Sequence, residues 1–101
     1  MRFVKTQNTK KNLEDLFEAM KLLKDPAETE DFLSDLCTPA ELNAMAERWK
    51  IARLLWSRKY SYRDISEITG ASTTTVGRVA RFLFQESNQG YLNLINRLEK
   101  L

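Results

Sequence analysis

The stretch that decides the fold is residues 61–84, SYRDISEITG ASTTTVGRVA RFLF, which has the pattern of two short helices joined by a tight turn. Ser61 is a favourable N-cap, and Asp64 lies three residues later, at the position whose side chain can bond back to the N-cap residue. Gly70 permits the left-handed backbone that ends a helix and redirects the chain. A helix, a glycine-containing turn and a second helix together predict a helix-turn-helix.

Apolar spacing assigns an inner side to each of these helices. In the first helix, Ile65 and Ile68 are three residues apart, and we expect them to make a one-sided apolar contact. The second helix begins with a cap at Ser72 or Thr73. Its predicted inner side consists of Val76, Val79, Ala80 and Leu83.

The second helix opens with four consecutive hydroxyl residues, Ser72, Thr73, Thr74 and Thr75. Such residues are poor helix formers, because their side chains compete for backbone hydrogen bonds. At the start of a recognition helix they would face base edges and phosphates, with Arg78 one turn further on. A long capping segment at an ordinary helix corner is the alternative explanation.

Basic charge is concentrated around this motif. The chain has a net charge of +2, but residues 48–84 hold eight basic and two acidic side chains, a local charge of +6. The other 64 residues hold eight basic and twelve acidic side chains, a charge of −4. This distribution favours a surface that meets a polyanion, and chance clustering on a solvated helix face is the alternative.

We therefore predict double-stranded DNA as a partner. Phosphate contacts give affinity without sequence discrimination. The basic candidates for them are Lys50, Arg58, Lys59, Arg63 and Arg81. Base contacts are expected from the hydroxyl residues Ser72, Thr73 and Thr74, since a threonine methyl group suits the methyl group of thymine. Arg78 donates to guanine if it projects outward and serves an internal pocket if it projects inward.

Helical patterns continue on both sides of the motif. Residues 1–10 show no period and are predicted to form a flexible N-terminal arm. Residues 11–101 are predicted to form a single all-helical DNA-binding domain, with the helix-turn-helix at 61–84. Its other helices are expected over about 12–24, 26–36 and 39–58, with a last one after Gly90.

The flanking helices differ in how they must be buried. The helix over 39–58 is apolar on two sides, so it should be the most buried element, with Trp49 and Trp56 in the core. The two helices before it are short and have narrow apolar stripes, which in the second consist of Phe32, Leu33 and Leu36. Neither would persist alone, and a second copy of the chain would provide the partner surface that they need.

Composition argues against several classes of protein. The single cysteine, Cys37, permits no disulfide within the chain and fits a reducing, cytoplasmic setting. The absence of histidine argues against a zinc site, and we predict no metal and no cofactor. No apolar run approaches the length of a membrane span. We also predict that the chain is not an enzyme, because it shows no nucleophile beside a base and no phosphate-cradling glycine loop.

From Thr38-Pro39 to Phe84 the sequence resembles the Trp repressor family, in its YerC/YecD-like branch. The residues that carry the likeness are Leu36-Cys37-Thr38-Pro39-Ala40-Glu41, Arg48, Leu54-Leu55, Ser61, Arg63, Ile65, Gly70-Ala71 and Thr75-Val76 with Arg78. The resemblance implies an all-α fold of about six helices, an intertwined homodimer and a role as a DNA-binding transcriptional regulator. By the same likeness, the residues at the DNA surface are Arg63, Ser72, Thr73 and Thr74.

The resemblance also implies an effector pocket, in which arginines bracket a bound amino acid. The pocket residues that match are Arg48, Thr75 and Arg78. Where tryptophan-responsive members have glycine and serine, this chain has Val79 and Phe82, whose bulk should fill the space that an indole ring needs.

A second departure concerns charge. Asp35 replaces a leucine of the opposite wall, and its carboxylate should repel the carboxylate of the ligand. We therefore expect little or no tryptophan binding. Arg48 and Arg78 would instead hold a different small-molecule effector, or form an ion pair with Asp35 or Glu47.

One other function remains open at this point. The helical pair and its basic patch would also suit a protein-interaction module that binds an acidic protein partner.

Overall fold

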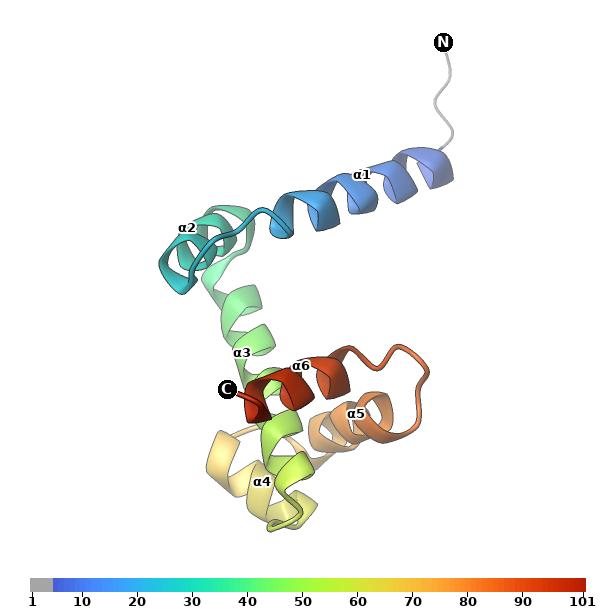
Figure 1. The fold of residues 1–101 in the computed structure, drawn as a ribbon. Coiled ribbons are helices and arrows are strands. Elements are labelled where there is room, and N and C mark those ends of the chain that lie inside the picture. The colour runs from blue at the N-terminus through green and yellow to red at the C-terminus, as the bar shows by residue number, and fades with distance from the viewer. Residues whose placement is uncertain (1–4) are drawn as a thin grey trace. The chain divides into compact units, whose positions relative to one another are not determined.

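The computed structural model describes residues 5–101, which form six α-helices and no β-strand (Figure 1). The helices are α1 (Lys5–Met20), α2 (Pro26–Leu36), α3 (Pro39–Ser57), α4 (Tyr62–Thr69), α5 (Thr73–Phe84) and α6 (Gly90–Glu99). The prediction of an all-α fold with about six helices and a helix-turn-helix is therefore confirmed. Within this described range, no helix is both long and apolar enough to cross a lipid bilayer.

The described residues fall into two compact units, one that ends at Thr38 and one over Pro39–Leu101. The first unit contains α1 and α2, and the second contains α3 to α6. The division has a physical basis, because every residue of the buried apolar cluster lies in the second unit.

Helix α1 is longer at its start and shorter at its end than the sequence predicted. It begins at Lys5, so residues 5–10 of the predicted flexible arm are helical, while residues 1–4 of that arm lie outside the described residues. Once a helix is nucleated, each further residue adds a hydrogen bond, and no proline or glycine interrupts residues 5–12. After Met20 the chain tightens into shorter-range hydrogen bonds, such as that from Leu23 N to Met20 O at 3.2 Å.

Helix α2 begins and ends where predicted, and its apolar stripe is only partly buried within one chain. Asp25 caps it by accepting a hydrogen bond from the backbone N–H of Glu28 at 2.8 Å. Phe32 and Leu33 are only half-buried, and Leu36 is 51% exposed. The α1 stripe is similarly open, since Phe17 is 60% exposed. These stripes have found no complete cover within one chain, as expected if a partner surface provides it.

The second unit is built around the C-terminal half of α3, with α4, α5 and α6 packed against it (Figure 1). Its core is a cluster of ten buried side chains, Ile51, Ala52, Leu55, Ile65, Ala71, Val76, Val79, Ala80, Leu83 and Ile95. All four residues predicted for the inner side of the second motif helix belong to it. Trp49 and Trp56 are half-buried and pack against this cluster.

Helix α3 is the spine of the second unit only over its second half. Ile51 and Ala52 are completely buried, whereas Met45 and Ala46 in the first half are exposed. The prediction that α3 is the most buried element is therefore not met in a single chain, since α3 has three buried residues and the shorter α5 has four. Helix α3 has two apolar sides, and the residues that α4, α5 and α6 bury all lie in its second half.

The turn between α4 and α5 is held by local hydrogen bonds. Ser61 and Asp64 form the predicted capping box, with both hydrogen bonds at 3.0 Å. Gly70 has the predicted left-handed backbone, at φ +80°. The Ser66 hydroxyl donates to the carbonyl of Ala71, and the Ala71 N–H donates to the Thr69 hydroxyl oxygen at 3.2 Å.

The predicted pairing of Ile65 with Ile68 is wrong. Ile65 is completely buried, but Ile68 is 47% exposed. Ile68 lies at the end of α4, just before the turn at Gly70, where no other element of the second unit covers it. Ala71, beyond the turn, contributes the next buried side chain instead.

Alanine substitution at two glycines separates backbone strain from packing. A methyl group at Gly70 would meet no atom within 4 Å, so Gly70→Ala should destabilise the protein by about 1 kcal/mol through the left-handed backbone alone. Gly77→Ala is the matched control, because it lies inside α5 and its methyl group would lie 4.0 Å from the Tyr62 ring. It should be neutral or stabilise by up to about 1 kcal/mol.

Urea unfolding at one fixed protein concentration measures both effects. Equal destabilisation by the two substitutions would contradict a strain that is specific to the Gly70 turn.

Candidate nucleic-acid interface

The hydroxyl run at the start of α5 divides into two roles. Ser72 is the N-cap, since its hydroxyl accepts from the Thr75 N–H at 3.1 Å and lies 3.0 Å from the Thr75 hydroxyl. Thr73 and Thr74 are exposed, and their hydroxyls form no hydrogen bond with any residue in the range 5–101. Capping therefore accounts for half of the run and leaves these two hydroxyls available to a ligand.

The exposed face of α5 continues from this tip as a row of polar side chains. Thr74, Arg78 and Arg81 are spaced i, i+4 and i+7, which places them on one side of the helix. All three are exposed, and the opposite side carries the buried Val76 and Val79. This row has the form of a surface for an extended anionic partner.

Basic residues are also exposed on α4 and in the loop before it. Arg63 is exposed and lies 3.6 Å from a carboxylate oxygen of Glu67, one turn along α4. Lys59 is exposed in the loop. The exposed aromatic residues Tyr60 and Tyr62 on either side of Ser61 were not among the predicted site residues. In the sequence, only their positions beside the helix cap distinguish these two tyrosines.

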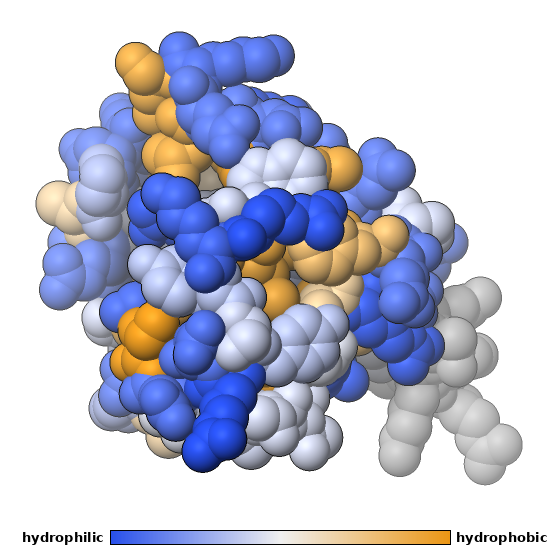
Figure 2. Space-filling view, turned by 90° about the horizontal axis from the view of Figure 1, so that it is seen from below, coloured by the Kyte–Doolittle hydropathy of each residue, from blue (hydrophilic) through white to orange (hydrophobic). Residues whose placement is uncertain are grey.

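The surface around these elements is mainly hydrophilic. Figure 2, viewed from below relative to Figure 1, shows polar side chains over most of this face and apolar ones only in small separate patches. A surface of this kind suits a polar, charged partner better than a second apolar core.

The basic residues predicted to contact phosphates differ in whether their charge is already paired within the chain. Arg81 pairs with Glu86, with 2.7 Å between its Nε and the carboxylate oxygen, and Arg63 pairs with Glu67. Arg58 has a left-handed backbone, at φ +63°, and its guanidinium lies 4.5 Å from the centre of the Phe84 ring.

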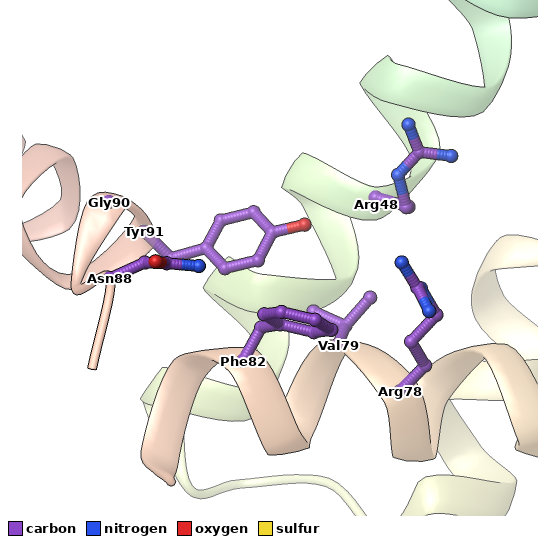
Figure 3. Close-up of a pocket in the computed structure, with 7 residues that line it drawn as sticks. All are labelled: Arg48, Arg78, Val79, Phe82, Asn88, Gly90 and Tyr91. Atoms are coloured by element: carbon purple, nitrogen blue, oxygen red, sulfur yellow. The ribbon is translucent and has the colours of Figure 1, made fainter. Parts of the chain in front are cut away.

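A cavity of about 380 Å³ lies beside α5, within the second unit. Its lining residues are Arg48, Arg78, Val79, Phe82, Asn88, Gly90 and Tyr91 (Figure 3). Four of the five residues predicted for the effector pocket are therefore together, while Thr75 is not in the lining. Asn88, Gly90 and Tyr91 were missed, because only the tertiary fold brings the loop before α6 to this place.

Positive charge in the cavity is not neutralised. Arg48 and Arg78 reach the same space from α3 and α5, and the Tyr91 hydroxyl points towards it (Figure 3). Neither arginine forms an ion pair within the second unit, so the predicted pairing with Glu47 is wrong. Asp35, the other predicted partner, belongs to α2 in the first unit.

The orientation of Arg78, which the sequence left open, is towards the cavity. Its guanidinium lies 5.0 Å from the centre of the Phe82 ring. Val79 and Phe82, which we expected to fill this space, form part of the cavity wall. A volume of this size is within the range of small-molecule pockets.

Three comparisons with known proteins agree with this architecture. The model of the family described as Trp repressor protein matches residues 11–99. The uncharacterised protein YerC of Bacillus subtilis (strain 168) is 38% identical over 90 residues, which cover 89% of this chain and 85% of YerC. The crystal structure of a TrpR-like protein from Eubacterium eligens ATCC 27750 superposes with a TM-score of 0.82 at 41% identity, covering 90% of this chain and 92% of that one.

Proposed function

This chain belongs to the Trp repressor family, and we propose that it is a sequence-specific DNA-binding regulator of transcription that acts as a homodimer in the cytoplasm. Two copies would place their α5 helices in successive major grooves about 34–36 Å apart, a docking geometry for which Trp repressor is itself a type case. The observation that carries the proposal is the exposed tip of α5, where the hydroxyls of Thr73 and Thr74 form no hydrogen bond with any described residue.

Each part of this surface has a distinct proposed role. Thr73 and Thr74 would contact base edges in the major groove, with the cap residue Ser72 beside them. The basic residues proposed for the phosphate backbone are Arg58, Lys59, Arg63 and Arg81, with Arg78 at the border of the cavity. Phosphate contacts would supply most of the affinity, and the hydroxyl tip would supply the preference for one sequence.

The proposed homodimer rests on apolar surface that one chain does not bury. Such surface lies on α1 and α2 and again on α6, where Leu94 and Leu98 are 53% and 43% exposed. Exposed apolar residues at helical spacing on three helices favour association with a second copy.

We further propose that the cavity is an effector site formed by Arg48, Arg78, Val79 and Phe82, with Thr75 on the same helix. Two unpaired guanidinium groups favour an anionic ligand. Tryptophan is not expected to bind well, because Arg78 already lies over the ring of Phe82 and a ligand ring would have to displace that contact.

Electrophoretic mobility shift at low and high salt tests the proposed function against the rival interaction module. Retarded DNA that is released as salt rises supports DNA binding. A protein that retards no DNA at low salt would favour an acidic protein partner.

Arg63→Ala should weaken binding to all DNA sequences and reduce the slope of log affinity against log salt by about 1, because it removes a phosphate contact. Fluorescence anisotropy titrations across a salt series measure this slope. Glu67→Gln is the control, since it releases Arg63 from its ion pair and should not weaken binding. An unchanged slope in Arg63→Ala would exclude this residue from the interface.

Thr74→Ala should mainly reduce the preference for the selected site, by about 1–3 kcal/mol of discrimination if the threonine contacts a base. The measurement compares a duplex that the wild type selects from a random library with an unrelated duplex. Equal losses on both duplexes would count against a role in base recognition.

Isothermal titration calorimetry with L-tryptophan should show little or no binding, because the protein's own Phe82 ring lies against Arg78. Phe82→Ser is the informative companion variant, since it removes that ring from the cavity wall. Micromolar affinity in the wild-type protein would overturn the expectation.

A further inference from the structure

Arg58 occupies a backbone position that suits glycine. It follows Ser57, the last residue of α3, and has a left-handed backbone at φ +63°. This conformation strains a residue that carries a Cβ, whereas glycine adopts it freely. Strained residues of this kind persist where the surrounding structure holds them, and they cluster at functional sites.

The Arg58 side chain is the end of a stack that spans three helices. Its guanidinium lies 4.5 Å from the centre of the Phe84 ring, at the end of α5. Phe84 stacks on Trp56 of α3, with 6.5 Å between the ring centres and 23° between the ring planes. Trp56 in turn donates its Nε1–H to Glu99 of α6 at 2.9 Å.

This stack fixes the guanidinium without using its hydrogen bonds. The guanidinium lies over the Phe84 ring, and a contact with a ring takes up none of its N–H donors as conventional hydrogen bonds do. The Arg58 side chain forms no ion pair or hydrogen bond with any other described residue, unlike Arg63 and Arg81, which pair with carboxylates. Arg58 therefore presents an unneutralised, oriented fork of donors to solvent, which matches the geometry of a phosphate group.

The position of the stack fits a phosphate better than a base. Helix α5 has 12 residues and is about 18 Å long, whereas the major groove is about 8.5 Å deep. If the N-terminal tip enters the groove, the C-terminal end at Phe84 stays outside it, on the side of the phosphate backbone. Arg58, held over Phe84, would then face that backbone.

We propose that Arg58 binds a DNA backbone phosphate and that Phe84 is its positioning residue, which holds the guanidinium in the binding orientation before DNA arrives. This inference rests on the proposed DNA-binding function and adds to it a device that prepares one contact. The competing explanation is purely structural, with the guanidinium serving only to cover the exposed ring of Phe84.

Substitutions at both positions distinguish the two explanations, with binding measured by fluorescence anisotropy on a labelled duplex selected by the wild type from a random library. Arg58→Gly should bind DNA about tenfold more weakly and lower the salt slope by about 1, through loss of one charged contact. The same variant should be at least as stable to heat as the wild type, because glycine relieves the strain at φ +63°. A structural role alone predicts the reverse, a less stable protein with unchanged binding.

The role of Phe84 has its own pair of variants. Phe84→Leu keeps the charge of Arg58 but removes the ring face, so affinity should fall about threefold through the cost of ordering a freed side chain, with little change in salt slope. Phe84→Tyr keeps the ring and should bind like the wild type. Arg97→Ala removes an equal charge from α6 and controls for net charge alone.

Each possible negative result tells the failure of the proposed function apart from the failure of this inference. Wild-type protein that binds no DNA at low salt would overturn the proposed function and this inference together. If the wild type binds and Arg58→Gly binds equally well with the same slope, the inference fails and the proposed function stands. If Arg58→Gly is weakened while Phe84→Leu matches the wild type, the positioning role of Phe84 is excluded.

Discussion

The left-handed backbone at Gly70 is the constraint on which the second unit depends. It ends α4 and redirects the chain so that Ala71 enters the core and Ser72 can cap α5. The polar groups of this sharp reversal are satisfied locally, because the Ser66 hydroxyl and the Thr69 hydroxyl bond to the backbone of Ala71. These hydrogen bonds restrict the conformations that the turn can adopt. The direction of α5, and with it the exposure of its hydroxyl tip, therefore follows from a single residue type at a single position.

Features that are set by local hydrogen bonds and helical period are the ones that the sequence predicts well. Ser61 and Ser72 each cap a helix within three residues of the group that they accept from, so the chain need not be folded to reveal them. The buried side of α5 is predictable for a related reason, since four apolar residues at helical spacing leave one possible inner face. The same signals place Thr73 and Thr74 outside, and the structure agrees.

Burial and side-chain pairing depend on neighbours that a sequence does not identify. Ile68 and Met45 are apolar and suitably spaced, yet both are exposed, because no element of the same unit covers them. The cavity is a similar case, since Tyr91 reaches it only through the path of the loop before α6. The contact between Arg58 and Phe84 carries no local signal at all: it depends on α3 and α5 ending side by side.

Helix α5 carries both the proposed recognition surface and one wall of the cavity. Arg78, Val79 and Phe82 line that wall, while Arg48 approaches from α3, so a ligand held by both arginines would connect the two helices. Such a ligand changes DNA affinity only if it binds one arrangement of α5 more tightly than another, and a tenfold change requires a difference of about 1.4 kcal/mol. Two guanidinium groups that share a cavity without a counter-charge repel each other. A bound anion offsets that repulsion and so favours the arrangement in which the two groups are close together. The charge of a ligand, more than the shape of its ring, is therefore the property through which this cavity can act on α5.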